Sequence, residues 1–269
     1  MSEPQHVRES GTGTPLVLLH AFPLSSRMWE RQLAVLPGPD GTAARVLAPD
    51  LRGFGAAPQS GEAPSLDVLA DDVARLLDRS GVGRAVVGGL SMGGYVALAF
   101  ARRHGDRLAG LLLADTKADP DTGEARANRE RIARAVLARD SVRLLVDEQL
   151  PQPQLSATTV RERPEVVDRV RALMSEAAPA AVAWAQRAMA ARPGSRDVLP
   201  AVSVPALVVV GEEDAITPVG DARAMAGALP DAELRIVPGA GHLTPLEAPD
   251  AFDDAVRALL ARVTAADRP

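Results

Sequence analysis

Ser91 is the centre of a Gly-x-Ser-x-Gly pattern at residues 89–93. This pattern is typical of nucleophilic serines, which need a very tight turn that lifts the hydroxyl above the edge of a sheet. Alone it is weak, since a glycine-rich chain of this length matches it by chance in roughly one case in ten. An apolar run over 84–88 precedes the pattern and a helix-forming run over 93–100 follows it. This context predicts a nucleophile at a strand–turn–helix junction, against the alternative of an incidental serine in a glycine-rich turn.

A serine hydroxyl needs an adjacent base to attack at neutral pH, and histidine is the usual choice. The chain has four histidines. His242 follows the last apolar run, where a loop brings a side chain over the carboxyl edge of a parallel sheet, so we predict that it is the base. The alternative is an ordinary loop histidine. Of the other three, His6 lies in the polar N-terminus, His104 at a cationic helix end, and His20 at the end of the first apolar run.

An imidazole base needs a carboxylate that orients it. Three acids, Glu212, Glu213 and Asp214, follow the fifth apolar run. Asp214 lies deepest in this loop, so we predict that it is the orienting acid, and we expect the two glutamates to be solvated or to cap a helix. Asp115, at the end of the fourth apolar run, is the reserve candidate.

Acyl transfer through a serine also needs preorganised donors for the oxyanion. The backbone N–H of Met92, directly after the serine, is predicted to be one donor, and the backbone N–H of Phe22, in the loop after the first apolar run, the other. We expect Leu90 and Trp184 to line the substrate pocket. For Trp184 and Met189, packing between helices is the competing interpretation.

Six short apolar runs lack the alternation of half-exposed strands, so they are predicted to be strands covered on both faces. They are Pro15–His20, Arg45–Pro49, Ala85–Gly88, Leu108–Ala114, Ala206–Val210 and Glu233–Val237. Helical stripes lie between them, for example Leu66–Leu77, with Ser65 as N-cap and Gly81 as stop, and Phe252–Val263. This alternation predicts an α/β fold with a mostly parallel, doubly wound sheet.

Residues 117–200, here called the helical insertion, contain no strand candidate. They contain helical runs over Arg131–Leu145, Glu165–Met174 and Pro179–Ala191, separated by prolines. We predict a lid inserted after the fourth parallel strand, with residues 1–116 and 201–269 forming the core domain; an extra helical layer without a gating role is the alternative. The acidic loop Asp119–Glu124 superficially resembles a calcium loop, but Pro120 does not fit that pattern.

Composition excludes several classes of function. The net charge of −5 provides no basic footprint for nucleic acid, and the absence of cysteine excludes disulfides and thiolate chemistry. No apolar run is long enough to span a bilayer, and Met1–Gly13 lacks the apolar region of a signal peptide. We therefore expect a cytoplasmic protein that needs no metal or organic cofactor, binds a small-molecule substrate, and does not bind nucleic acid or membrane. The oligomeric state stays open.

With these residues in place, the chain resembles the α/β-hydrolases over nearly its whole length. The matching segments are His20–Ser25, Asp50–Gly55, Gly89–Gly94, Gly211–Asp214 and Gly241–His242. Within that superfamily it is similar to small bacterial carboxylesterases, cofactor-free haloperoxidases (perhydrolases) and 3-oxoadipate enol-lactonases. The resemblance implies the chain order Ser, Asp, His for the three catalytic groups.

The same resemblance implies that His20 holds the oxyanion loop and takes no part in proton transfer. Many relatives have His-Gly where this chain has His20-Ala21, and alanine disfavours the positive φ that glycine adopts freely. The segment before Pro15 is short, so we expect an early antiparallel hairpin to be reduced to one strand. Haloalkane dehalogenases and epoxide hydrolases are excluded, since they use aspartate at the position of Ser91.

The expected reaction is hydrolysis of small carboxylic esters through an acyl-enzyme. A lactonase or perhydrolase that uses the same three residues is the nearest alternative. A non-catalytic binding protein built on the same fold is a further one, because function depends on the site and not on the fold.

Overall fold

The computed structural model describes residues 6–59 and 61–266. The prediction that Met1–Gly13 is not a signal peptide falls partly on residues 1–5, which lie outside the described residues. Among the described residues, no helix is both long and apolar enough to cross a bilayer.

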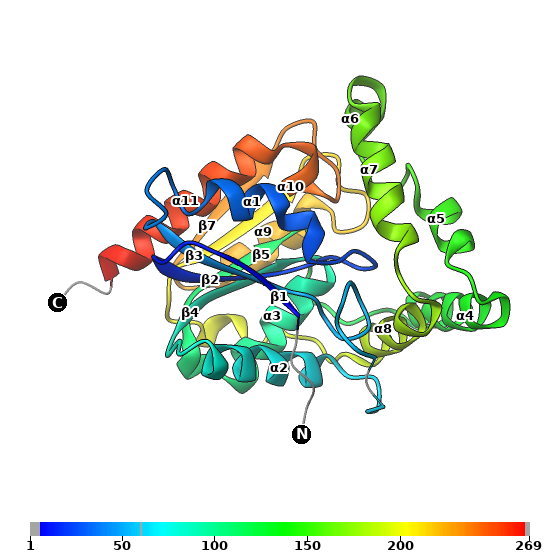
Figure 1. The fold of residues 1–269 in the computed structure, drawn as a ribbon, viewed down its shortest axis with the longest axis horizontal. Helices are drawn as coiled ribbons and strands as arrows, with labels where there is room; N and C mark the ends of the chain where they lie inside the picture. The colour runs from blue at the N-terminus through cyan, green and yellow to red at the C-terminus, as the bar shows by residue number, and fades with distance from the viewer. Residues whose placement is uncertain (1–5, 60, 267–269) are drawn as a thin grey trace.

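One sheet of seven strands forms the centre of the molecule, in the order β1-β3-β2-β4-β5-β6-β7 (Figure 1). Its strands are β1 (Val7–Ser10), β2 (Thr14–Leu19), β3 (Ala44–Pro49), β4 (Ala85–Leu90), β5 (Leu108–Ala114), β6 (Ala206–Gly211) and β7 (Ala232–Val237). All neighbouring pairs are parallel except β1 with β3. The six predicted parallel strands are confirmed, and a single antiparallel strand precedes them.

Helices cover both faces of the sheet, with α1 and α11 on one face and α2 and α3 on the other (Figure 1). Outside the insertion, the helices are α1 (Glu30–Val35), α2 (Leu66–Arg79), α3 (Met92–Arg103), α9 (Val219–Ala228), α10 (Thr244–Glu247) and α11 (Pro249–Ala266). The predicted N-cap of α2 is confirmed, since the Ser65 hydroxyl accepts a hydrogen bond from the Asp67 amide. The doubly wound α/β fold is thus confirmed.

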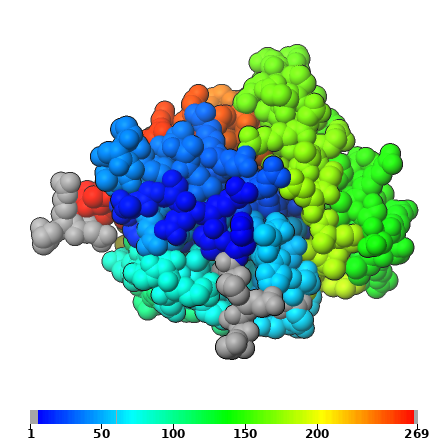
Figure 2. All heavy atoms as spheres, viewed as in Figure 1, coloured from blue at the N-terminus to red at the C-terminus, as the bar shows by residue number. Residues whose placement is uncertain are grey.

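The helical insertion contains five α-helices and no strand, and it lies at one end of the molecule (Figures 1 and 2). The helices are α4 (Gly123–Arg139), α5 (Arg143–Gln149), α6 (Ala157–Glu162), α7 (Pro164–Ser175) and α8 (Pro179–Ala191). The prediction of one helix over Arg131–Leu145 is wrong. Asp140 adopts the left-handed conformation, with φ of 45°, and ends α4 before α5 begins. Such a cap ends a helix although the apolar pattern continues beyond it.

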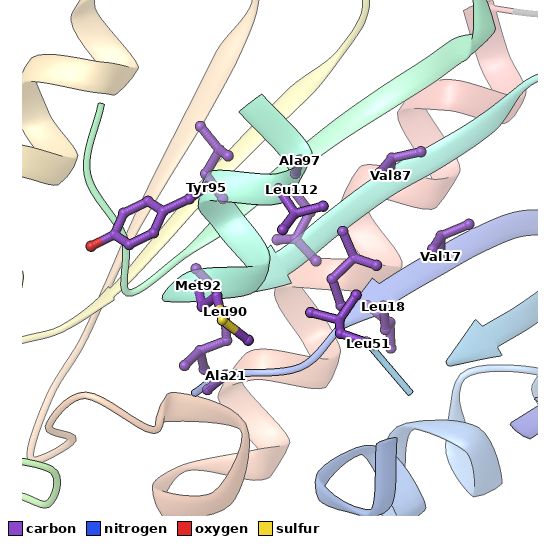
Figure 3. Close-up of a cluster of buried hydrophobic side chains, with 14 of the residues drawn as sticks. Val17, Leu18, Ala21, Leu51, Val87, Leu90, Met92, Tyr95, Ala97 and Leu112 are labelled. Carbon is purple, nitrogen blue, oxygen red and sulfur yellow. The ribbon is translucent and has the colours of Figure 1, made fainter. Parts of the chain in front are cut away.

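The core consists of the inner strands and the faces of the helices packed on them. Figure 3 shows part of it, with side chains from β2, β4, β5 and α3 gathered into one buried cluster. The strands β4, β5 and β6 are buried at every position, which explains why their sequences are continuous apolar runs. This burial fixes the strand ends, and the loops that follow them carry the polar groups described below.

Candidate active site

Six parallel strands, β2 to β7, end at the same edge of the sheet. The pairing register places Leu19 beside Gly89, Leu90 beside Ala114, and Gly211 beside Val237. Strand β2 has β3 on one side and β4 on the other, so the chain order reverses there. Ligands of open α/β sheets bind at such switch points, beyond the carboxyl ends of the strands.

Ser91 is at the turn between β4 and α3 and has φ of 56° and ψ of −110°. A non-glycine residue in this region costs about 1–3 kcal/mol, and the surrounding structure must hold it there. The Ser91 amide donates to the Ala114 carbonyl at 2.9 Å, and the Thr116 hydroxyl donates to the Ser91 carbonyl at 2.9 Å. Both polar groups of the Ser91 backbone are thus tied to β5 and the loop after it.

The glycines on either side of Ser91 allow this turn to exist. A Cβ at Gly93 would lie 2.2 Å from the Leu19 carbonyl oxygen, and a Cβ at Gly89 would lie 2.6 Å from the same atom. Strand β2 and the start of α3 therefore approach more closely than any side chain permits. This contact is the structural reason for glycine on both sides of the serine.

His242 lies between Ser91 and Asp214. Its Nε2 is 2.8 Å from the Ser91 Oγ, and its Nδ1 is 2.9 Å from the Asp214 Oδ2. Asp214 is held in turn by the Ile216 and Thr217 amides, at 2.8 and 3.0 Å from its Oδ1, and by the Thr217 hydroxyl, at 2.6 Å from its Oδ2. A carboxylate in this position fixes the tautomer with the proton on Nδ1, which leaves Nε2 free to accept the serine proton.

The pKa shifts of His242 and Asp214 support these roles of base and orienting acid. Burial alone lowers the pKa of His242, but the charge and hydrogen bond of Asp214 and the nearby charge of Asp115 raise it above its usual value. Burial raises the pKa of Asp214, but the charge of His242 and the hydrogen bonds from His242 and Thr217 lower it by more. The pKa of Asp214 therefore lies below the usual range. Asp214 is therefore ionised, and His242 gains stability as an imidazolium when a proton arrives from the serine.

Asp115, the reserve candidate for the acid, is fully buried. Its Oδ1 accepts from the Gly211 amide at 2.9 Å, and its Oδ2 accepts from the Thr244 hydroxyl at 2.6 Å. Burial and the charge of Asp214 raise its pKa well above the usual value. Asp115 thus joins the end of β6 to the start of α10 through these hydrogen bonds, and Asp214 is the acid that contacts the imidazole.

The two predicted oxyanion donors are at the same edge of the sheet. Met92 is the first residue of α3, where helical amides have no partner within the helix. Within the described residues, the amides of Phe22 and Met92 donate to no other group. The Phe22 side chain lines the cavity at Ser91, whereas the Met92 side chain is buried in the core (Figure 3). Two free backbone donors beside a serine can stabilise a negatively charged oxygen.

His20 supports the loop that carries Phe22. Its Nε2 accepts from the Leu51 amide at 3.0 Å, and its Nδ1 is 2.9 Å from the Ala21 carbonyl oxygen. Burial lowers the pKa of His20, so the ring stays neutral. The two remaining histidines do not contact Ser91 or Asp214: His6 lies 2.8 Å from Asp50, which directly follows β3, and His104 lies 2.8 Å from Asp71 on α2.

A cavity of about 260 Å³ opens onto Ser91 and His242 between the sheet edge and the helical insertion. Its lining on the insertion side combines polar and apolar side chains. Besides Ser91 and His242, the residues that line it are Phe22, Tyr95, Ala125, Asn128, Arg129, Ile132, Leu145, Gln149, Pro153, Gln154, Gln186, Met189 and Ile216. The sequence singled out Met189 among the insertion residues, but no spacing or motif pointed to the polar ones.

The two predicted pocket residues do not line this cavity. The Trp184 side chain is buried in helix packing, and its indole N–H donates to the Glu62 carbonyl at 2.9 Å. Leu90 is fully buried, and Figure 3 shows it within the core cluster. Both predictions are corrected: Trp184 lies on another part of the surface of α8 from Gln186 and Met189, and Leu90 points into the core because side chains alternate along a strand.

Two glutamates close to Asp214 and His242 bind the helical insertion. The Glu213 carboxylate accepts from the Ala157 amide at 3.1 Å and from the Thr158 hydroxyl at 2.8 Å, so it caps α6, one of the two roles expected for it. The buried Glu247 carboxylate accepts from the Ser156 amide at 2.8 Å and from the Leu243 amide at 3.0 Å. Each glutamate ties a core loop to the insertion.

Nothing in the described part of the chain gathers three or more histidine, aspartate or glutamate side chains in an arrangement that fits a metal ion.

The sequence profile of the alpha/beta hydrolase fold matches residues 14–249. The chain belongs to the α/β-hydrolase family. Among solved structures, this family member is similar to a thermophilic esterase from Thermogutta terrifontis with malate bound, with a TM-score of 0.91 and 43% identity over 96% of this chain and 93% of that chain. The enol-lactonase from Burkholderia xenovorans LB400 has a TM-score of 0.84 and 30% identity over 96% of each chain.

A curated relative, the non-heme chloroperoxidase assigned in Synechocystis sp., is 27% identical over 88% of this α/β-hydrolase and 87% of its own length. The predicted resemblance to esterases, enol-lactonases and haloperoxidases is thus confirmed. The family and these relatives support hydrolase activity on a small molecule.

Proposed function

We propose that this α/β-hydrolase cleaves small carboxylic esters through an acyl-enzyme on Ser91. The observation that carries the proposal is the continuous hydrogen-bonded chain of Ser91, His242 and Asp214, with 2.8 and 2.9 Å at its two contacts. The esterase relative that is 43% identical supports the same class of reaction.

In the proposed reaction, His242 Nε2 takes the Ser91 proton while the oxygen attacks the ester carbonyl. The oxyanion forms against the Phe22 and Met92 amides, and loss of one such donor typically costs about 10²–10³ in rate. The imidazolium, stabilised by Asp214, gives its proton to the leaving alcohol. A water molecule then attacks the acyl-enzyme with His242 again as the base, which releases the acid and restores Ser91.

We also infer that residues 117–200 act as a lid over this site. Ten of the residues that line the cavity belong to this segment, among them Asn128, Arg129 and Met189. Lids of this kind exclude water and shape the substrate pocket, so the acyl preference depends on side chains of the insertion.

The test is turnover of p-nitrophenyl acetate and labelling of Ser91 by a fluorophosphonate. We expect wild-type activity to be abolished by Ser91→Ala and to be unaffected by Ser175→Ala, which removes an exposed hydroxyl on α7. Absence of both turnover and labelling in the wild type would refute the proposal and favour a binding protein on the same fold.

Lactone hydrolysis and perhydrolysis could use the same three residues, and the choice of substrate distinguishes them from ester hydrolysis. The similarity to an enol-lactonase and to a chloroperoxidase favours testing them. Faster cleavage of a lactone than of open esters would indicate a lactonase. Halogenation that depends on both peroxide and a carboxylic acid would indicate a perhydrolase.

A further inference from the structure

The cavity at Ser91 is positively charged on the insertion side. Arg129 is the one permanently charged side chain among its lining residues, and no aspartate or glutamate of the described chain lines it. Three other cavity residues, Ala125, Asn128 and Ile132, lie on α4 at the spacing of one helical face with Arg129. This face of α4 therefore points toward the cavity.

Arg129 is held in place by a buried carboxylate. Its Nε donates to Asp121 Oδ2, and its Nη1 donates to the Gln186 amide oxygen at 3.0 Å. Asp121 also contacts Arg192, whose Nη1 is 2.8 Å from Asp121 Oδ1. Burial raises the pKa of Asp121, but these two arginines keep it below its usual value. One carboxylate thus serves two guanidinium groups, and the cluster retains a net positive charge.

The remaining guanidinium donors point to a ligand of opposite charge. Within the described residues, Nη2 of Arg129 has no hydrogen-bond acceptor. Side-chain amides of Asn128, Gln149, Gln154 and Gln186 surround the same cavity and supply neutral hydrogen-bond partners. The N–H groups of Nη2 can therefore donate to a carboxylate of the ligand, and such a charge-assisted hydrogen bond is stronger than one between neutral groups.

Building on the ester hydrolase proposed above, we propose that Arg129 binds a free carboxylate of the substrate. The substrates are then anionic esters or lactones, such as half-esters of dicarboxylic acids, whose charged end lies against α4 while the ester carbonyl reaches Ser91. Arg129 serves as a specificity residue, and Asp121 is the positioning residue that orients its guanidinium.

The test compares anionic and neutral esters of matched length. The monoethyl esters of succinate, adipate and suberate are each paired with the neutral ethyl ester of the same chain length, ethyl butanoate, hexanoate and octanoate. Ethanol release gives kcat/KM for each. We expect the wild type to prefer the half-ester in at least one pair, by about 10- to 100-fold, the range of a hydrogen bond to a charged group.

Arg129→Gln is expected to reduce this preference by a similar factor, mainly through KM, and Arg129→Lys to retain part of it. The matched control is Arg134→Gln, an arginine on the same helix with 77% side-chain exposure, which should keep the wild-type preference. The preference of the wild type needs no variant, so the proposal stays testable if Arg129→Gln does not fold.

Two results would overturn the proposal. One is equal or faster cleavage of the neutral ester in every pair. The other is a loss in Arg129→Gln that is the same for both members of a pair, which indicates a structural role of the Arg129–Asp121 contact. If neither ester is cleaved and a fluorophosphonate leaves Ser91 unlabelled, the ester hydrolase function itself is refuted, and this result is distinct from the other two.

Discussion

Replacement of Gly93 by alanine tests whether the turn at Ser91 depends on the close approach of β2 to α3. An alanine Cβ would lie 2.2 Å from the Leu19 carbonyl oxygen and 2.7 Å from the Leu19 carbonyl carbon. Ordinary contacts of this kind exceed about 3 Å, so strand and helix must separate by about 1 Å. Neither atom of Leu19 can swing away, because both belong to the backbone of a central strand.

The cost follows from this displacement. Overpacking of a well-packed interior typically costs about 1–3 kcal/mol, and we expect the upper end because backbone has to move. For a chain of this size, about 3 kcal/mol lowers Tm by about 6–12 °C. Activity should fall by about 100-fold or more, since a shift of about 1 Å in the positions of reacting groups has that effect. Ser91 moves with α3, whereas the Phe22 amide moves with β2.

The assay combines thermal unfolding with p-nitrophenyl acetate turnover and the rate of fluorophosphonate labelling, measured well below the Tm of the variant. Gly220→Ala is the matched control. Gly220 also lies in the first turn of a helix, α9, and no described atom is within 4 Å of a Cβ built there. That variant should keep full activity and gain up to about 1 kcal/mol of stability. Wild-type Tm and turnover in Gly93→Ala would refute the steric reasoning.

Three further predictions concern the polar residues of the site. Asp214→Asn should lower kcat by about 10⁴-fold, as loss of the orienting carboxylate does in Ser-His-Asp triads. The control is Glu212→Gln, a change at an exposed neighbouring residue, which should leave kcat unaltered. A loss below tenfold in Asp214→Asn contradicts the assigned role. In the wild type, kcat/KM should rise with pH as His242 loses its proton, with a midpoint above 6.5 because the nearby carboxylates raise the pKa of His242. A midpoint at or below 6.5 would argue against this effect of the carboxylates. Glu247→Gln should cost about 1–3 kcal/mol in thermal unfolding, since a buried carboxylate that accepts two amides is lost, and a Tm equal to that of Glu212→Gln would rule this out.

The residues that are predictable from sequence are those placed by strand ends. Ser91 and Asp214 directly follow or lie close to buried strands, and His242 follows the last one. A parallel sheet brings the carboxyl ends of all its strands to one edge. Locating the strands in the sequence is therefore sufficient to predict that the three side chains lie close together. The tight turn at Ser91 carries its own local signal, the flanking glycines.

The residues on the insertion side are not predictable in this way. Helix α4 contains five arginines, and nothing in their spacing separates Arg129 from those that face solvent. Which face of α4 points to the cavity depends on its packing against α8, which is a tertiary contact between segments distant in sequence. The same reason explains why Met189, and not the predicted Trp184, is the residue of α8 that lines the cavity. Both positions are apolar, and only the packing of α8 decides which side chain faces the cavity.

The hydrogen bonds between insertion and core connect substrate choice to turnover. The His242 amide donates to the Gln154 carbonyl at 3.2 Å, and Glu213 and Glu247 accept from the amides of Ala157 and Ser156. The loops that carry the acid and the base are therefore bonded to the same short segment of the insertion, and Gln154 also lines the cavity. A change in this segment shifts the pocket wall and His242 together, so we expect it to alter kcat as well as KM. Arg129 lies on a different helix, α4, without a direct bond to either loop, and a change there should act on substrate choice with far less effect on the proton transfer.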